Sequence, residues 1–297
     1  MYEQILAHAR SSIWAIDPDK YDAIMQMLEA RASGAAATAE SLEAFAADNR
    51  RRSAGRTSGA VAILPVYGTI LQRGNMFTEA SGAVSTTILG QQINDLLARE
   101  DVGSIILEFD SPGGTVYGVP ELGEQIYQSR GKKPITAYVN PYAASAGYWL
   151  AAACDEVVIT PSGKAGSIGV FARHIDYSMQ NEMLGESVTY IQYGKNKTEA
   201  NPDEPLSEEG ARELQRHVDE YGRQFDSAVA KYRGVTAAKV RSDFGQGRVF
   251  GAKEAVSVGM ADRVATLGDT ISRLAKGHTP KSRPRLERAK KYFSIGY

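Results

Sequence analysis

The amino-acid sequence predicts an α/β fold in which a largely parallel sheet is flanked by helices. Three observations support this prediction: short apolar runs of strand length, helical patterns between them, and a glycine turn directly after one run. Because parallel neighbours need a crossover connection, such alternation indicates repeated β-α units. A chain of 297 residues, 43% of them hydrophobic and 23% charged, can bury one sizeable core with flanking segments.

The two ends of the chain differ in composition from its middle. Residues 1–30 have helical spacing on both sides of Pro18, which predicts an N-terminal appendage of two short helices. Residues 31–59 are rich in Ala, Ser, Gly and Arg, as expected of a linker or a weakly held helix. The compact domain is expected at 60–275. The basic, proline-containing segment 276–297 is predicted to be a mobile end rather than a contact for nucleic acid or a capsid.

Within the compact domain, predicted strands and helices alternate. The first strand starts at Ala60, and a helical pattern through Ile88 and Leu97 leads to a buried strand at 105–109 that ends at the glycine turn. The elements expected next are a helix at 119–129, a strand at 135–139, a helix at 143–153, strands at 157–160 and 167–171, a helix at 177–184 and a strand at 188–193.

The longest predicted helix follows Pro205. Ser207 is a suitable N-cap, acidic residues in the first turn favour the helix dipole, and Gly234 ends the helix. Its apolar positions recur at steps of three and four residues. This stripe can pack on the sheet or on another subunit, and the sequence leaves both interpretations open.

Charge, cysteine content and hydropathy exclude several classes of protein. The net charge of −1 gives no bulk attraction to nucleic acid or membranes. The single cysteine, Cys154, excludes an internal disulfide, and its apolar surroundings predict a buried, inert thiol. No secretory signal is visible at the start, and no stretch approaches the ~18 apolar residues of a membrane span. We therefore expect a cytoplasmic protein without a membrane anchor.

Two segments can carry chemistry, namely Asp110–Gly114 and Tyr142–Tyr148. The glycines of the first can turn backbone N–H groups toward an anion, and the second can expose Ser145 at the start of a helix. Each also has a plain structural interpretation, as a tight turn and as close packing of a helix on a sheet. Their order favours a site, since both loops leave the same edge of a parallel sheet, where ligands bind.

A serine nucleophile needs a base, and the residues alone leave that base open. Of the four histidines only His174 is near the predicted core in sequence, and we expect it in a loop or at a helix start. A Ser-His-Asp hydrolase that uses Ser145 and His174 is therefore one alternative.

Five blocks of sequence resemble the signal peptide peptidase A family of serine peptidases. They are Ser-Pro-Gly-Gly at 111–114, Ala-Ala-Ser-Ala-Gly-Tyr-Trp-Leu-Ala at 143–151, Gly-Ser-Ile-Gly-Val at 166–170, Gly-Lys-Asn-Lys at 194–197 and Gly-Arg-Val-Phe-Gly-Ala-Lys-Glu-Ala at 247–255. The resemblance covers about residues 60 to 270. It implies the Clp protease/crotonase-like fold and a serine–lysine dyad that needs no histidine, cofactor or metal.

Carried over by motif, the resemblance makes Ser145 the nucleophile and Lys197, rather than Lys195, the general base. A lysine that accepts a serine proton must be neutral, so the pKa of such a lysine has to fall from ~10.4 to about 7–8. Burial in an apolar pocket is the usual means.

The remaining site residues also follow from the resemblance. The backbone N–H groups of Gly114, in preference to Gly113, and of Ala146 are expected to form the oxyanion hole. Ser167 corresponds to a hydroxyl that orients the lysine. Its block also offers a strand edge to which an extended peptide can add by backbone pairing.

The segment 12–18 resembles the leader of the phage and prophage branch, whose head maturation peptidases cleave scaffold and capsid proteins. The implied partners are a polypeptide substrate and further copies of the chain, in the host cytoplasm or an assembling capsid. In some relatives the serine and lysine come from adjacent subunits, and the sequence leaves open whether they do so here. No nucleic acid is required. Three alternatives stay open: a signal-peptide-peptidase-like enzyme that degrades peptides, a crotonase-type acyl-CoA enzyme, and a non-catalytic capsid-assembly component.

Overall fold

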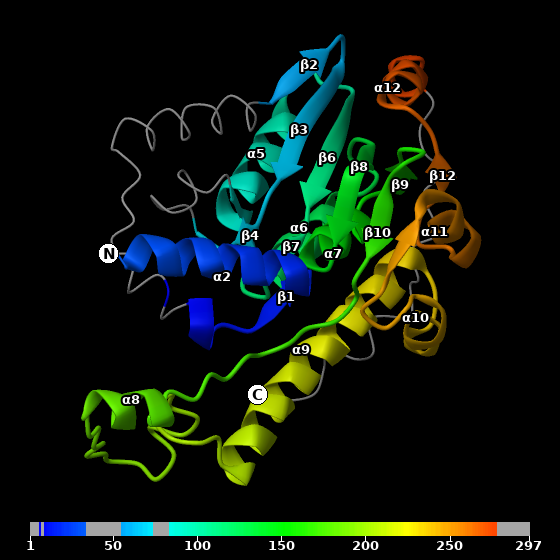
Figure 1. Ribbon diagram of the computed structural model, residues 1–297. Coiled ribbons are helices and arrows are strands. Elements are labelled where there is room, and N and C mark those ends of the chain that lie inside the picture. Colours follow the sequence, from blue (N-terminus) through cyan, green and yellow to red (C-terminus); the bar gives the residue numbers. More distant parts are fainter. Residues whose placement is uncertain (1–5, 7–8, 34–54, 74–82, 278–297) are drawn as a thin grey trace.

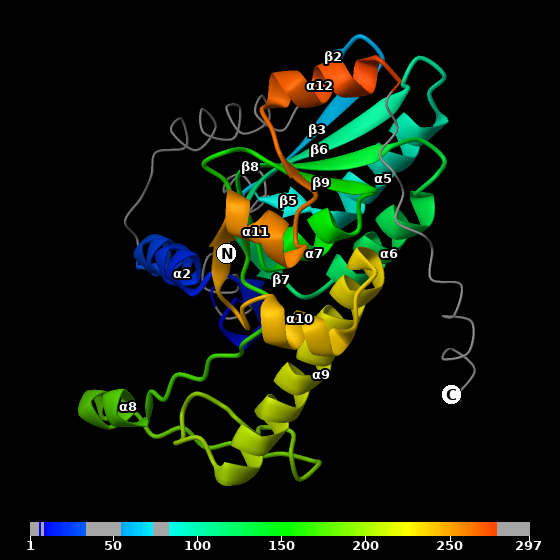
Figure 2. The ribbon, with the colours of Figure 1, turned by 90° about the vertical axis from the view of Figure 1, so that its right-hand side faces the viewer.

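The computed structural model describes residues 6, 9–33, 55–73 and 83–277 (Figure 1). Most of the predicted linker at 31–59 and nearly all of the predicted tail at 276–297 lie outside the described residues. The described chain forms a sheet covered by helices, a small second sheet beside it, and a segment that projects away from both (Figures 1 and 2).

The larger sheet has eight strands, and its main path runs β11-β10-β8-β6-β3-β2. The strands are β2 (Arg56–Ser58), β3 (Val61–Tyr67), β6 (Ser104–Ser111), β8 (Ile135–Ala144), β9 (Glu156–Ile159), β10 (Lys164–Gly166), β11 (Val249–Gly251) and β12 (Arg263–Val264). The long central strands β3, β6 and β8 are parallel, and β9 and β10 both join β8 in parallel. β2 and β11 run antiparallel at the two ends of the path. The predicted α/β class with a mostly parallel sheet is confirmed.

Helices cover both faces of this sheet (Figure 2). The main core lies between the sheet and α5 (Thr86–Ala98), α6 (Val119–Ser129), α7 (Ala146–Ala152) and α9 (Glu208–Arg233). Side chains of the opposite face pack against α12 (Leu267–Ala275). α10 (Ala237–Asp243) packs on α9, and α11 (Ala252–Val258) follows β11. Because strands buried on both faces are continuously apolar, runs such as 105–107 are good predictors of the central strands.

A second sheet of four short strands has the order β1-β7-β4-β5. Its strands are β1 (Trp14–Ile16), β7 (Gly113–Thr115), β4 (Ile70–Leu71) and β5 (Val84–Ser85). Helical residues lie on both sides of Pro18 as predicted, at 9–11 and in the helix that starts at Pro18, but the prediction missed β1 between them. The second helix is present as α2 (Pro18–Ala32), but Trp14–Ile16 is a strand because its alternate side chains enter two separate apolar clusters.

Two predicted strands are wrong. At 167–171 only an isolated bridge joins Phe171 to Trp14, and the strand lies earlier, at β10. Residues 188–193 have no regular structure, and the side chain of Ile191 is 99% exposed. An apolar run forms a strand only where another strand offers it hydrogen bonds, and no strand in the described ranges does so here.

Residues 172–206, which include α8 (Ser178–Leu184), project from the body and are called the arm below (Figures 1 and 2). α9 follows the arm and returns the chain to the body. Ser207 caps it as predicted, accepting a hydrogen bond from the Gly210 N–H at 3.0 Å, and Gly234 ends it in the left-handed conformation at φ 66°. The C-terminal half of α9 packs in the core, where Phe225 stacks on Trp149 at 4.3 Å between ring centroids.

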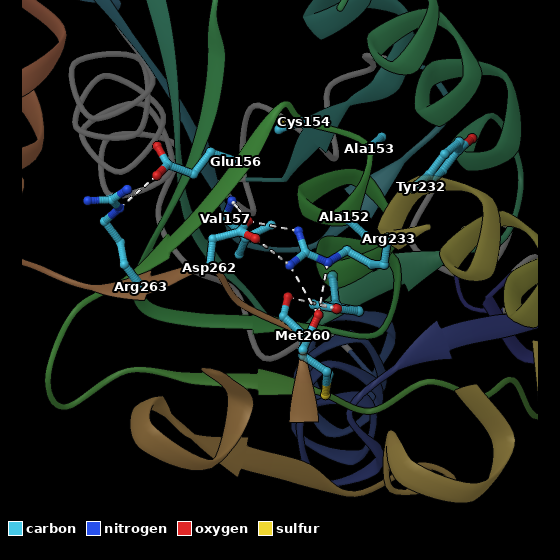
Figure 3. A network of polar contacts seen from close by, with 12 residues as sticks. Ala152, Ala153, Cys154, Glu156, Val157, Tyr232, Arg233, Met260, Asp262 and Arg263 are labelled. Atoms are coloured by element: carbon cyan, nitrogen blue, oxygen red, sulfur yellow. Dashed lines mark hydrogen bonds and ion pairs between the residues drawn. The ribbon is translucent and has the colours of Figure 1, made fainter. Parts of the chain in front are cut away.

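A buried arginine fixes the C-terminal end of α9 (Figure 3). The Arg233 side chain is 1% exposed and makes two hydrogen bonds of 2.9 Å to the Asp262 carboxylate. It also donates to the Gly259 carbonyl, and Asp262 accepts a further bond from the Val157 N–H at 2.8 Å. The ion pair therefore ties α9 to β9 and to the chain after α11.

Replacing the buried arginine is expected to destabilise the fold strongly. Arg233→Met removes the ion-pair partner of the Asp262 carboxylate, so we expect the free energy of unfolding to fall by about 3 kcal/mol. Urea denaturation measures this change. The matched control is Arg216→Met, which removes an exposed ion pair with Glu213 on the same helix and should leave stability nearly unchanged. Equal effects of the two substitutions would contradict the role given to Arg233.

Candidate active site

Ser145 lies where β8 ends and α7 begins. Its backbone has φ 53° and ψ −118°, a strained conformation for a residue with a side chain. The Ser145 N–H donates to the Gly166 carbonyl at 2.7 Å, and the Ser145 carbonyl accepts from the Trp149 N–H at 2.9 Å. Since the surrounding structure holds the strain, the hydroxyl has one defined direction, as in the strained strand-to-helix turns that carry nucleophiles in α/β hydrolases.

The two glycines of the turn are required by close backbone packing. A Cβ on Gly114 would lie 1.8 Å from the Ile70 carbonyl oxygen. A Cβ on Gly113, which has φ +104°, would lie 2.2 Å from the Ala15 carbonyl oxygen and 3.0 Å from Ser145 Cβ. The glycine turn is thus a tight structural element and also borders the serine.

A second serine supports this turn. Ser111 Oγ donates to the Gly68 carbonyl at 2.7 Å and accepts from the Gly113 N–H at 3.2 Å. The Gly113 N–H therefore already has a partner within the chain.

Small residues around Ser145 serve close packing. Ala143, Ala144 and Ala146 are fully buried, and a Cβ on Gly147 would lie 3.3 Å from Ser111 Cβ. Ala146 is the first residue of α7, so its N–H has no acceptor within the helix.

The segment after β10 borders Ser145 on another side. Ser145 Oγ donates to the Gly169 carbonyl at 3.3 Å. Ser167 is buried, has φ 54°, and donates its backbone N–H to the Arg248 carbonyl at 2.7 Å. A cavity of about 410 Å³ opens beside this segment, lined by residues 168–170 and by side chains of α9 and α10.

Lys197 lies on the arm and is exposed. Its backbone N–H donates to the Gly194 carbonyl at 3.1 Å, and in the described part of the chain no hydrogen bond or ion pair engages its ammonium group. The nearby Lys195 contacts Glu209 at 3.3 Å. The structure therefore brings Ser145, the glycine turn and Ser167 together, but within one chain it does not bring Lys197 to them.

His174, the alternative base, makes its contact elsewhere, and the single cysteine is buried. His174, at the start of the arm, contacts the Asn201 carbonyl at 3.0 Å through Nε2 rather than Ser145. Cys154 is fully buried as predicted, and burial raises the pKa of its thiol. Among the described residues, no group of three or more His, Cys, Asp or Glu side chains is arranged to hold a metal ion. None of the helices described is long and apolar enough to span a membrane.

Sequence reasoning missed two contacts at the site. Strand β1 pairs with the glycine strand β7, and the Tyr142 hydroxyl donates to Asp17 at 2.5 Å. Burial and this hydrogen bond raise the pKa of Tyr142. The one available signal was the apolar run at 13–16, which is compatible with a short strand as well as a helix.

A strained serine at a strand-to-helix junction beside a glycine turn is typical of α/β hydrolases that transfer acyl groups. Comparison of the sequence with protein families gives a match to the model of peptidase family S49 over residues 128–280, more than half of the chain. The chain belongs to peptidase family S49.

Similar curated proteins come from phages and bacteria. The chain is 31% identical over 237 residues to the head-tail preconnector protein GP5 of Enterobacteria phage P21, covering 80% of this chain and 47% of that protein. It is 30% identical over 212 residues to the capsid assembly protease C of Escherichia phage lambda, covering 71% and 48%. It is also 30% identical to a putative signal peptide peptidase SppA of Enterococcus faecium, covering 62% and 54%. The chain thus spans about half the length of these relatives.

Among solved structures, a mutant of ClpP1 from Listeria monocytogenes aligns with a TM-score of 0.43 at 14% identity. The alignment covers 70% of this chain and 94% of that one.

A methyl group at the glycine turn is expected to be poorly tolerated. Gly114→Ala places a Cβ against the Ile70 carbonyl, so we expect a loss of about 3 kcal/mol in the free energy of unfolding. Thermal and urea denaturation measure it. Gly251→Ala is the control, because a Cβ there meets nothing within 4 Å. A stable Gly114→Ala protein would mean that β4 and β7 are further apart than described.

Proposed function

We propose that this chain is a serine endopeptidase in which Ser145 attacks the peptide bond and Lys197 of a neighbouring copy is the general base. The observation that carries the proposal is the strained Ser145 held beside the glycine turn in a chain of a peptidase family. The two phage relatives favour cleavage of scaffold or capsid proteins during head assembly in the host cytoplasm.

The proposed reaction uses backbone donors and two side chains. Ser145 Oγ attacks the carbonyl carbon while its proton passes to neutral Lys197 Nζ, and the resulting oxyanion is bound by the N–H groups of Gly114 and Ala146. The lysine then gives the proton to the leaving amine, and water hydrolyses the acyl ester on Ser145 by the reverse steps.

The position of Lys197 favours a base supplied by another copy. Within its own chain the lysine lies on the exposed arm, whereas Ser145 is fully buried in the body. A neighbouring site could also supply the apolar walls that neutralise a lysine. In that site, Ser167 is proposed to orient the lysine through its hydroxyl.

The surface of the arm supports self-association. Large apolar side chains on the arm are exposed in the single chain, with exposures of 38–101%: Met179, Met183, Leu184, Val188, Tyr190, Ile191, Tyr193 and Leu206. Contiguous exposed apolar surface is typical of protein–protein contacts. A second copy that covers these side chains would bring its Ser145 next to Lys197 of the first copy.

Substitution of the dyad tests the enzyme. In the intact oligomer, Ser145→Ala and Lys197→Met are each expected to lower kcat for peptide cleavage by at least ~10³-fold, because the two side chains act as a unit. Lys195→Met, two positions away on the same arm, is the matched control and should retain activity. Fluorophosphonate labelling should be lost in Ser145→Ala. Full activity of Lys197→Met, together with loss in a His174→Ala variant, would replace the dyad by a serine–histidine mechanism.

Mixing the two inactive proteins tests whether sites are shared. If the serine and lysine come from different copies, random exchange of equal amounts of Ser145→Ala and Lys197→Met subunits should restore about a quarter of the wild-type activity per site. Native mass spectrometry confirms exchange, and unmixed variants are the controls. No recovery in proteins that have exchanged would show that each site uses one chain.

A further inference from the structure

Strand β1 lies between two other backbone segments, next to Ser145. On one side it pairs antiparallel with β7, with Trp14 opposite Thr115 and Ile16 opposite Gly113. On its other side, Trp14 and Phe171 exchange two backbone hydrogen bonds of 2.9 Å. A three- to five-residue segment paired on both edges has the geometry of a bound peptide in β-strand addition.

The register places one residue of β1 at the glycine turn. The Val116 N–H donates to the Ile13 carbonyl at 3.2 Å, and the Asp17 N–H donates to the Pro112 carbonyl at 2.8 Å. Because hydrogen-bonded pairs alternate along an antiparallel ladder, the pair midway between these two, Ala15 and Gly114, is also of the hydrogen-bonded kind. The Gly114 N–H proposed for the oxyanion hole thus faces a carbonyl of the same chain.

The same strand comes close to the serine at the glycine turn. Ala15 and Ser145 are both 0% exposed. The Ala15 carbonyl oxygen and Ser145 Cβ border the same glycine, Gly113, whose missing side chain leaves room for both. A substrate carbonyl oxygen has to accept a hydrogen bond from the Gly114 N–H. The Ala15 carbonyl already occupies that position.

The strand contributes side chains to two apolar clusters, with Ile13 and Ala15 in the main core. Trp14 and Ile16 belong to a separate cluster, whose other buried members are Leu6, Ala9, Tyr21, Met25 and Leu28. The Tyr142 hydroxyl holds Asp17, at the end of the strand. The buried members of this second cluster all come from the N-terminal segment itself, so departure of β1 from β7 withdraws only the side chains of Ile13 and Ala15 from the main core.

We propose that residues 13–17 are an internal ligand of the peptide site. They fill the slot between β7 and Phe171 that an extended polypeptide substrate enters, and they must leave before cleavage. The inference rests on the proposed peptidase function for its consequence, but the occupied slot is a binding property that can be measured separately.

The experiment weakens the strand in the full chain and measures binding of a competing peptide. Ala15→Pro removes the N–H that pairs with β7, whereas the matched control Ala15→Ser keeps it. Both are made in a Ser145→Ala background to prevent turnover. The probe is a fluorescent synthetic peptide with the sequence of residues 11–19, and anisotropy reports its dissociation constant. We expect at least ~10-fold tighter binding to Ala15→Pro than to Ala15→Ser, with slower amide exchange at 113–116 when the peptide is bound.

A milder variant guards against misfolding. Tyr142→Phe removes only the hydroxyl that holds Asp17, and about threefold tighter binding is expected from the loss of one hydrogen bond. If Ala15→Pro fails to fold, the peptide affinity of Tyr142→Phe tests the inference. Equal peptide binding by the parent, Ala15→Ser and the strand-weakened proteins would overturn the inference.

Activity separates this inference from the proposed function. With Ser145 intact, Ala15→Pro should hydrolyse peptides at least ~10-fold faster than Ala15→Ser, because β1 has left the slot in a larger fraction of the molecules. Tighter binding without Ser145-dependent hydrolysis in any protein would sink the peptidase proposal and leave the internal ligand standing. Ser145-dependent hydrolysis at the same rate in the parent, Ala15→Pro and Ala15→Ser proteins would support the peptidase proposal and overturn the internal ligand.

Discussion

The close approach of three backbones at Gly113 and Gly114 is the constraint on which the site depends. β1 approaches from one side, β4 from another, and the Ser145 turn from a third, at distances that leave no room for a side chain. The glycine pair thus joins the small sheet to the carboxyl ends of β6 and β8. Without it, the serine turn would lose the surface against which its strained conformation is held.

The rigid body and the arm have different physical roles. Ser145, the glycine turn and Ser167 are set by buried backbone hydrogen bonds, and the Arg233 ion pair fixes the end of α9 behind them. Lys197 is on a segment with exposed apolar side chains, and the residues that the structure describes give its ammonium group no acceptor. Such a division makes the proposed activity conditional on assembly, since the base would reach a serine only when two copies are in contact.

The sequence predicted those parts of the fold that are governed by local patterns. The central strands, the helix at 119–129 and both ends of α9 were confirmed because continuous apolar runs and caps act over a few residues. β1 and the irregular course of 188–193 were not predictable in this way. Whether an apolar run is a strand depends on a partner strand that is distant in sequence or absent, and periodicity carries no information on that partner. For the site, motif resemblance located Ser145 and the glycine turn, but the exposure of Lys197 and the cover over the serine are tertiary facts.

Phe171 connects the N-terminal segment to the arm. It is the residue directly before the arm, it pairs with Trp14 of β1, and its ring meets Tyr21 of α2 at 5.4 Å. Arg173, two residues into the arm, forms an ion pair with Asp22 of the same helix. The N-terminal segment therefore touches both the glycine strand and the root of the arm that carries Lys197. If β1 gives way to a substrate strand, the same change releases the root of the arm, so opening of the slot and placement of the base would be one coupled step.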